Sequence, residues 1–334
     1  MSEKILITGV GGFIGSTMLK KYTETLEDIK VIGIYTSSLP YNKDIHNYKS
    51  PDLYDCDIRD AKHVKEIIWN YKPTIIYHLA AQSLPMKSIA DPDTTIDINS
   101  KGTINIFEAI CSAQYIDKNY DPIVIVACSS AEYGESFTNI PYMVTKGFGL
   151  SEEADLKPLH PYGISKVCQD MLARYYYVRY GIRCIRARIF NTTGPGKTDD
   201  VCSDLIRRIV NINRNHEEDR TLYVGNLGSR RAILDVTDTI SALESLAYRG
   251  IAGEAYNISA HSAVSVQEII DRIERIANTK FDVEIDPAYV RSNDEPIIIG
   301  DTSKIEKDVG WTPTIGLQKT LEDMYKYWDE RAYN

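Results

Sequence analysis

Long apolar runs and basic runs are both missing from this sequence. No apolar stretch approaches the roughly 18 residues that a membrane-spanning helix needs, and no signal peptide precedes the first predicted strand. The net charge of −9 and the lack of a basic tract argue against a nucleic-acid-binding surface. We therefore expect a cytoplasmic protein whose partners include neither a membrane nor a nucleic acid.

Paired cysteines and metal-ligand spacings are missing as well. The six cysteines lie far apart, none belongs to a Cys-x-x-Cys pair, and most fall within apolar runs. This usage indicates buried free thiols in a reducing compartment. No group of histidine, cysteine and carboxylate residues has ligand spacing, so no metal is expected. No linker divides the 334 residues, which suit one large or two closely merged domains.

A glycine-rich turn stands near the start of the chain. The apolar run 5–7 predicts a buried strand, and a helical pattern covers 16–26. Between them, Gly9, Gly12 and Gly15 are spaced three apart. Glycines permit a tight turn and let backbone N–H groups approach a pyrophosphate, while the following helix directs its positive end at the same group. This context favours a dinucleotide-binding turn over an ordinary strand–turn–helix.

Apolar runs and helical patterns continue to alternate along the chain. Further strands are predicted at 31–34, 74–81, 122–128 and 183–189, and further helices at 61–71, 99–113 and 160–180. Alternation of this kind is typical of an α/β fold with a doubly wound parallel sheet.

The ends of these strands bear on the choice of cofactor. An acidic residue after the second strand would bind the ribose hydroxyls of NAD. Here Tyr35-Thr36-Ser37-Ser38 follows instead, which slightly favours NADP, although no arginine stands there either. Asp57-Ile58 is a candidate adenine contact, and a loop aspartate at a helix start explains Asp57 nearly as well. The small residues of Leu79-Ala80-Ala81 would let a cofactor lie close to the main chain. His78 fits a hydrogen-bonded core residue better than a catalytic one.

Tyr162 and Lys166 are the strongest candidates for chemistry. They are four residues apart at the start of a predicted helix, so their side chains share one face. An ammonium near a phenol lowers the phenol pKa, and such a phenol can act as a general acid or base. Tyr142 and Lys146 have the same spacing, but no helical pattern aligns them. Ser129, Ser130 and Glu132 follow the 122–128 strand, where ligands of parallel sheets bind, although a polar turn with a serine N-cap explains them equally well.

In order along the chain, Thr-Gly-x-x-Gly-Phe-x-Gly, His78-Leu79-Ala80-Ala81, Ser129-Ser130 and Tyr162-x-x-x-Lys166 resemble the extended short-chain dehydrogenase/reductases that act on nucleotide sugars. The resemblance implies a Rossmann sheet with a bound nicotinamide cofactor. It implies Tyr162 as the acid/base, and Lys166 as its partner and as the ligand of the nicotinamide ribose. It also implies a serine that hydrogen-bonds the same sugar oxygen, for which we choose Ser130 without excluding Ser129. It implies cofactor contacts from Gly9, Gly12, Phe13, Ile14, Gly15, Thr36, Asp57, Ile58, Leu79, Ala80, Ala81, Tyr162 and Lys166.

The same resemblance divides the chain and suggests substrate contacts. The NAD(P)-binding domain would comprise residues 1–190, completed by about 232–260. Residues 191–231 and 261–334 would form a smaller, interleaved nucleotide-sugar-binding domain. The expected substrate-binding residues are Ser83, Asn191, Arg231, Arg291 and Asp294.

Among these enzymes, the segment 291–301 is most similar to the GDP-mannose 4,6-dehydratases and the GDP-4-keto-6-deoxymannose reductases, although Ser292 departs from their pattern. A dehydratase needs an additional carboxylate base, for which Glu132 is the candidate. A reductase needs only a hydride and a proton donor, and Asn191-x-x-Gly194-Pro195-Gly196 resembles the reductase loop more closely. We therefore expect reduction of a GDP-4-keto-6-deoxyhexose at C4, with a dehydratase and a 4-epimerase as alternatives.

Two further expectations concern assembly and a rival class of function. The family resemblance suggests a homodimer packed through the helices near 100–113 and 162–178. A cofactor-binding regulatory protein that has lost catalysis is the non-enzyme alternative, and the intact Tyr162/Lys166 pair argues against it.

Overall fold

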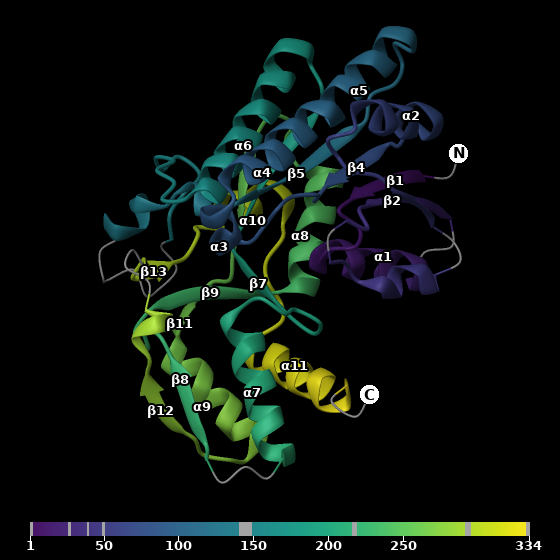
Figure 1. The fold of residues 1–334 in the computed structure, drawn as a ribbon. Coiled ribbons are helices and arrows are strands. Elements are labelled where there is room, and N and C mark those ends of the chain that lie inside the picture. The colour runs from purple at the N-terminus through teal and green to yellow at the C-terminus, as the bar shows by residue number, and fades with distance from the viewer. Residues whose placement is uncertain are drawn as a thin grey trace.

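A seven-stranded, wholly parallel sheet forms the larger part of the molecule (Figure 1). The structure is a computed structural model that describes residues 3–25, 28–38, 40–48, 51–139, 149–215, 219–290 and 295–331. The strand order is β10-β6-β5-β4-β1-β2-β3. The strands are β1 (Glu3–Thr8), β2 (Ile29–Tyr35), β3 (Asp52–Asp55), β4 (Ile75–His78), β5 (Ile123–Ser129), β6 (Cys184–Ile189) and β10 (Ala255–Ile258).

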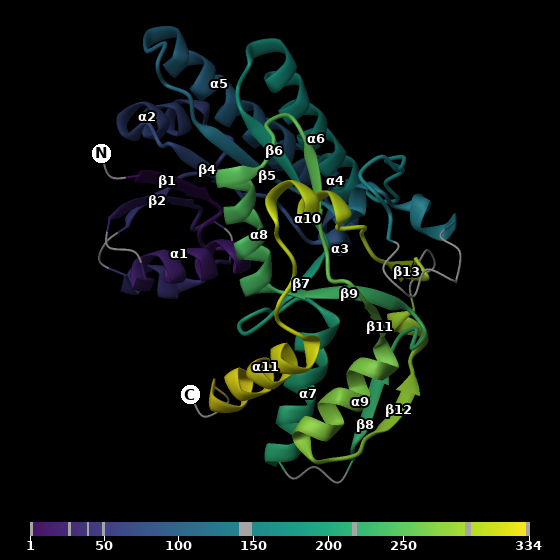
Figure 2. The same ribbon diagram turned by 180° about the vertical axis from the view of Figure 1, so that it is seen from behind.

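Helices cover both faces of this sheet, as the doubly wound prediction requires (Figures 1 and 2). Successive residues of a strand point to opposite faces, so Ile5 and Ile7 pack in one core while Leu6 packs in the other. The first core is closed by α1 (Phe13–Thr25), α8 (Val236–Arg249) and α10 (Ser303–Val309). The second core is closed by α2 (Ala61–Tyr71), α5 (Gly102–Ile116) and α6 (Pro161–Tyr180). The sheet and its helices confirm the predicted Rossmann architecture.

A smaller unit lies beyond the carboxyl ends of the strands (Figure 1). Its core is built mainly from α7 (Val201–Asn215), α9 (Val266–Ala277) and α11 (Leu317–Arg331). Two small sheets accompany these helices, made of β7 (Asn191–Thr193), β9 (Arg230–Asp235), β11 (Ala263–Ser265) and β13 (Ile297–Ile298), and of β8 (Thr221–Val224) and β12 (Asp282–Ile285).

Short helical segments connect these elements. They are η1 (Lys43–Asn47), α3 (Pro85–Ala90), α4 (Pro92–Ile96), η2 (Asp97–Lys101), η3 (Ser130–Glu132), η4 (Glu135–Asn139) and η5 (Pro287–Tyr289).

The chain crosses between the two units several times. The NAD(P)-binding domain was expected to be completed by about 232–260; residues 232–235 belong to β9, which pairs with β7 and β11 in the small sheet. The segment that completes the large sheet therefore starts at Val236, where α8 begins. β3 is also a strand that the sequence pattern did not predict.

Candidate active site

One continuous cleft of about 1300 Å³ runs between the large sheet and the smaller unit. It starts at the glycine turn after β1, passes Tyr162, and ends between α7 and η5. Pockets for a single small ligand are commonly about 300–1,000 Å³, so this cleft is large enough for two ligands. Among the described residues named above as candidates, all line the cleft except Glu132.

The glycine turn has the geometry that its sequence predicts. Gly9 has φ +71°, and a Cβ there would lie 2.8 Å from the backbone of Ala80. A Cβ on Gly15 would lie 2.3 Å from the carbonyl oxygen of Gly9, so α1 packs against the turn only because this side chain is absent. Gly12 begins the first helical hydrogen bonds by accepting from Ser16. The turn and the amino-terminal end of α1 therefore fit a dinucleotide pyrophosphate.

The adenosine end of the cleft contains charged groups besides the expected Asp57. Asp55 of β3 reaches the end of β2 and accepts a hydrogen bond from the Ser37 N–H at 2.9 Å, although Asp55 itself does not line the cleft. Arg59 does line it, and its guanidinium binds Asp57 at 2.6 Å and Asp97 at 3.1 Å. This ion pairing lowers the pKa of Asp57. Arg59 was not predicted from the sequence.

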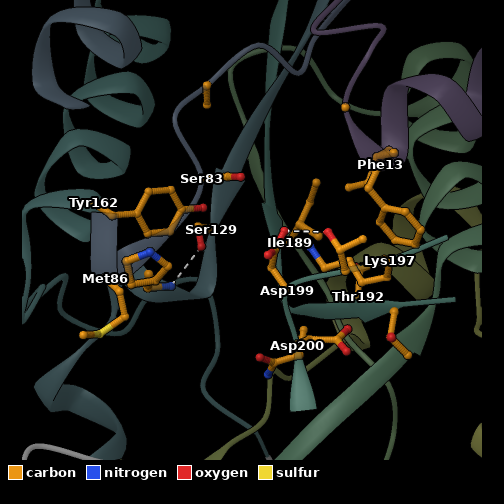
Figure 3. Close-up of a pocket in the computed structure, with 18 of the residues that line it drawn as sticks. Phe13, Ser83, Met86, Ser129, Tyr162, Ile189, Thr192, Lys197, Asp199 and Asp200 are labelled. Atoms are coloured by element: carbon orange, nitrogen blue, oxygen red, sulfur yellow. Dashed lines mark hydrogen bonds between the residues drawn. The ribbon is translucent and has the colours of Figure 1, made fainter. Parts of the chain in front are cut away.

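Tyr162 and Lys166 project from the first two turns of α6 into the cleft (Figure 3). The helix starts there because Pro161 occupies its first turn and the His160 ring accepts the Gly163 N–H at 3.1 Å. Lys166 is 3 % exposed, and its Nζ donates to the Ala127 carbonyl at 2.8 Å. Nζ lies 5.8 Å from the centre of the Tyr162 ring. The predicted pairing of the two side chains on one helical face is therefore present.

The predicted lowering of the Tyr162 pKa is wrong for this geometry. Burial raises the pKa of Tyr162 to about 12, and the hydrogen bond with the Ser129 side chain is the influence that opposes this rise. Burial also lowers the pKa of Lys166 to about 8. Desolvation of both groups outweighs the attraction between an ammonium and a phenolate. As a neutral phenol, Tyr162 is set up to donate a proton.

Ser129, rather than Ser130, is the serine that contacts Tyr162. β5 extends through Ser129, whose hydroxyl lies beside the phenol oxygen and opposes the rise of its pKa (Figure 3). Ser130 lines the cleft but begins the turn η3. Of the two serines that the sequence left open, Ser129 is therefore the one beside the phenol.

Glu132 does not occupy the position expected of a catalytic base. Its side chain is fully buried and points behind the strand, where it accepts the Ser129 N–H at 2.8 Å and lies 3.5 Å from Arg188. Ala131 lines the cleft in its place. The physical reason is the capping box around η3, which draws the Glu132 carboxylate back to the N-cap residue.

The smaller unit contributes polar groups to the middle of the cleft. The Nδ2 donor of Asn191 is buried and has no hydrogen-bond partner among the described residues. Arg231 lines the cleft nearby, and its Nη1 donates to the carbonyls of Arg230 at 2.9 Å and Glu295 at 2.8 Å. Ser83 lines the opposite side, close to Tyr162 (Figure 3). Arg291 and Asp294, like Tyr142 and Lys146, lie outside the described residues.

His78 is a core residue, as the sequence favoured. It is 1 % exposed, and its two ring nitrogens hydrogen-bond Thr8 and Thr103, each at 2.9 Å. Burial lowers the pKa of His78 to about 3.

Comparison with known proteins identifies the family. The model of the GDP-mannose 4,6-dehydratase family matches residues 6–324. The chain belongs to this family. It is thus an extended short-chain dehydrogenase/reductase, as the sequence motifs predict.

Named relatives cover nearly the whole chain. A GDP-6-deoxy-D-mannose reductase of Pseudomonas aeruginosa is 26% identical over 333 residues, which are 99% of each chain. A GDP-6-deoxy-D-talose 4-dehydrogenase of Aggregatibacter actinomycetemcomitans is 27% identical over 325 residues, which are 97% of each chain. The structure of RMD from Pseudomonas aeruginosa complexed with NADPH has a TM-score of 0.82 and 24% identity, and covers 98% of this chain and 99% of that one. At this identity the structural match establishes the fold.

Several cleft residues of this family member were not predicted at all. At the end beyond Asn191 and Arg231, Asp204 and Arg208 of α7 face the cleft with Tyr223 and Tyr289. Arg208 donates to the Tyr223 carbonyl at 2.6 Å, binds Asp204 at 2.6 Å, and lies 5.2 Å from the Tyr289 ring centre. The sequence shows only an acid and a base four residues apart on a helix, which is a common surface ion pair.

All six cysteines are free, as expected, and four of them are buried. In the part of the chain that is described, no helix is both long and apolar enough to cross a bilayer.

Proposed function

We propose that this protein reduces the C4 ketone of a GDP-4-keto-6-deoxyhexose, using NADPH or NADH. The observation that carries the proposal is the Tyr162–Ser129 pair in a cleft that also presents Ala131 where a dehydratase would need a carboxylate. Two curated relatives of full length are named for chemistry on GDP-6-deoxy sugars. The large sheet with α8 would bind the cofactor, and residues 191–231 and 261–334 would hold the sugar nucleotide.

The residues of the site divide the work of such a reduction. The reduced nicotinamide, when bound, supplies the hydride for C4. Ser129 would hold the C4 oxygen, and Tyr162 would give it a proton, since burial keeps the phenol protonated. Lys166, fixed by the Ala127 carbonyl, would hold the nicotinamide ribose beside the phenol. Asn191 and Arg231 would bind the diphosphate, for which the unpaired Nδ2 donor of Asn191 is suited.

The dehydratase alternative lacks its base. That reaction removes a proton from C5 and expels water from C6, so a carboxylate must reach the sugar. Glu132 is fully buried, paired with Arg188, and absent from the cleft. This placement supports a reductase over a dehydratase.

The far end of the cleft supports guanine as the base. A ligand whose sugar lies at Tyr162 and whose phosphates lie at Asn191 and Arg231 would place its nucleoside beside Asp204, Arg208 and Tyr289. Guanine presents N1–H and N2–H donors next to the O6 acceptor. A carboxylate beside a guanidinium matches both, and the Tyr289 ring offers an apolar surface to the base.

Arg59 and the free cysteines bear on the cofactor preference and on the cellular location. We propose NADP as the preferred cofactor, because Arg59 adds a guanidinium to a cleft wall that carries the Thr36 and Ser38 hydroxyls. Free thiols suit a reducing compartment, which supports the cytoplasm as location.

We propose a homodimer that packs through α5 and α6, which lie side by side on one face (Figures 1 and 2). Met171, Tyr175 and Val178 of α6 share one helical face and are 40%, 50% and 70% exposed. Tyr115 and Ile116 at the end of α5 are exposed by 81% and 67%. An apolar surface of this kind commonly marks a protein interface. Light scattering of the wild type and of Val178→Lys tests it, since the proposal expects a dimer and a monomer respectively.

The decisive experiment distinguishes three reactions. We expect NADPH oxidation with GDP-4-keto-6-deoxymannose, and no loss of water from GDP-mannose. Water loss from GDP-mannose would establish a dehydratase, and interconversion of 4-epimers without net NADPH use would establish an epimerase. Tyr162→Phe should lose about 10²–10⁴-fold in kcat while still binding NADPH. Unchanged biological activity of that variant would support the regulatory alternative instead.

A further inference from the structure

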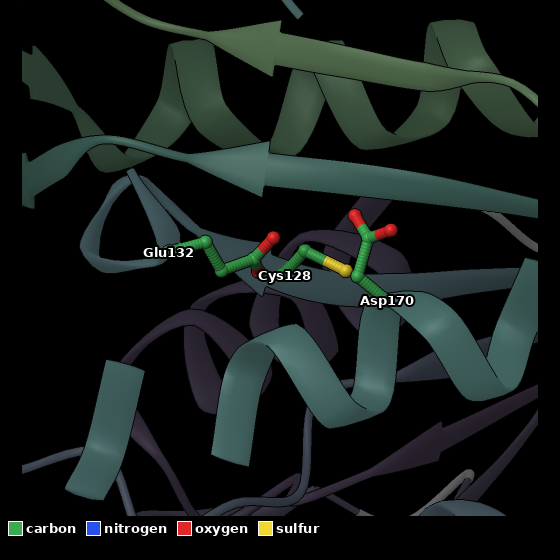
Figure 4. A group of neighbouring side chains, drawn as sticks. All are labelled: Cys128, Glu132 and Asp170. Carbon is green, nitrogen blue, oxygen red and sulfur yellow. The ribbon is translucent and has the colours of Figure 1, made fainter. Parts of the chain in front are cut away.

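The buried side chains of Cys128, Glu132 and Asp170 form a group (Figure 4) that adjoins Ser129, whose N–H donates to Glu132. Potential ligand atoms of Cys128, Glu132 and Asp170 all lie within 4.8 Å of one another. Arg188 enters this group and places its Nε 3.0 Å from Asp170 and 3.5 Å from Glu132. Arg186 binds the other Asp170 oxygen at 2.8 Å. Two guanidinium groups already balance the two carboxylates, so the group is not suited to a metal cation.

Glu132 connects this charged group to Ser129. One carboxyl oxygen accepts the Ser129 N–H at 2.8 Å, and the other faces Arg188 and has no hydrogen bond to any described residue. In return, the Ser129 hydroxyl accepts the Ala131 N–H at 3.1 Å. These reciprocal bonds occupy one acceptor site of the hydroxyl and restrict its rotation. The same hydroxyl lies beside the Tyr162 phenol (Figure 3).

We propose that Glu132 is a positioning residue for the C4 reaction: held by Arg188, it fixes the Ser129 backbone and thereby directs the Ser129 hydroxyl toward Tyr162. Glu132 has no direct role in the proposed reduction, because its side chain does not line the cleft. A Val at this position would leave the Ser129 N–H buried without a partner, which costs free energy that a shift of the backbone can relieve. The inference rests on the proposed function, because Ser129 acts there on the C4 oxygen.

Glu132 needs a side chain long enough to bring an oxygen to the Ser129 N–H, and it does not need a negative charge. Burial and the neighbouring Asp170 carboxylate raise the pKa of Glu132 to about 8. Either protonation state offers a carboxyl oxygen to the Ser129 N–H, and a glutamine offers an amide oxygen at the same place. An aspartate keeps the charge but is one methylene too short.

Steady-state kinetics of Glu132→Gln and Glu132→Asp test the proposal on the intact chain. We expect Gln to keep kcat within about threefold, and Asp to lose about tenfold in kcat with KM for the sugar nucleotide unchanged. The opposite order would overturn the proposal, because charge would then matter and reach would not.

A double-mutant cycle shows whether Glu132 acts through Ser129. In a Ser129→Ala background, Glu132→Asp should have no further effect on kcat, and an equal loss in both backgrounds would overturn the proposal. Crystal structures give a readout that needs no activity: in Glu132→Asp the Ser129 hydroxyl should turn away from Tyr162. An unmoved hydroxyl contradicts the positioning role. An inactive wild type would instead contradict the proposed function.

Discussion

The Ser129 hydroxyl lies beside the Tyr162 phenol and opposes the rise of its pKa, although the two residues come from different elements, the last residue of β5 and the first turn of α6. Both elements belong to the large sheet unit, so no residue of the smaller unit is needed to bring the two side chains together. Ser130, one residue further, begins the turn η3. Which serine lies beside the phenol therefore depends on where β5 ends.

Ser129→Ala and Ser130→Ala form a matched pair of variants. We expect Ser129→Ala to lower kcat by roughly 10–100-fold, because the C4 oxygen and the phenol lose a shared hydrogen bond. Ser130→Ala should stay within about threefold of the wild type. NADPH oxidation with GDP-4-keto-6-deoxymannose measures both. Equal losses in the two variants would contradict the assignment of Ser129.

Arg59→Ala tests the cofactor preference. The guanidinium lines the cleft and would face a 2′-phosphate, so its removal should weaken NADPH binding about tenfold and change NADH binding less than threefold. Lys62→Ala, which removes an exposed cation of the same helical region, is the control. Fluorescence titration with each cofactor gives the dissociation constants. A parallel loss for both cofactors would place Arg59 outside the phosphate site.

Asp204→Asn tests the recognition of guanine. The wild type should bind GDP about tenfold more tightly than IDP, which lacks the 2-amino donor, and the variant should lose that preference. Asp323→Asn on α11 is a suitable control, because Asp323 forms the same i,i+4 ion pair away from the cleft. Calorimetric titration with GDP, IDP and UDP supplies the affinities. Equal affinities of the wild type for IDP and GDP would contradict recognition of the guanine 2-amino group by Asp204.

His78 predicts how stability depends on acid. Its pKa is lowered to about 3 in the folded state, whereas the unfolded chain binds the proton near the ordinary value. The unfolded state therefore takes up more protons between about pH 6.5 and 3, and the free energy of unfolding falls by up to about 1.4 kcal/mol per pH unit in that window.

Urea denaturation of His78→Gln across the same pH range should show a shallower fall than the wild type. His46→Gln, at an exposed position, should keep the wild-type slope. Identical slopes in all three proteins would mean that His78 titrates freely in the fold.

Local patterns predicted the parts of the site that local structure builds. The Gly9–Gly15 turn and the Tyr162–Lys166 spacing each depend on a few consecutive residues, so the sequence was sufficient for both. The predicted strand ended at 128, whereas β5 continues through Ser129. Because side chains alternate along a strand, a change of one residue at its end exchanges which serine meets the phenol.

Contacts between distant segments could not be predicted in this way. The small sheet pairs β9 with β7, β11 and β13, all strands of two or three residues apart from β9 itself. Such short segments have no periodicity of their own. Glu132 was the candidate base because Ser130-Ala131-Glu132 resembles the Thr-x-Glu pattern of the dehydratases, but Arg188 and the Ser129 N–H hold its carboxylate away from the cleft. Neither partner is visible from the spacing.

The position of β10 at the edge of the large sheet constrains how this chain can be made. β10 completes the seven-stranded sheet, yet its residues 255–258 follow α7, β8 and β9 of the smaller unit in the sequence. During synthesis on the ribosome, one edge of β6 stays unpaired until the intervening segment and β10 have been synthesised. A chain truncated before residue 255 would keep this edge exposed, and its hydrogen-bonding groups would be open to pairing with another nascent chain.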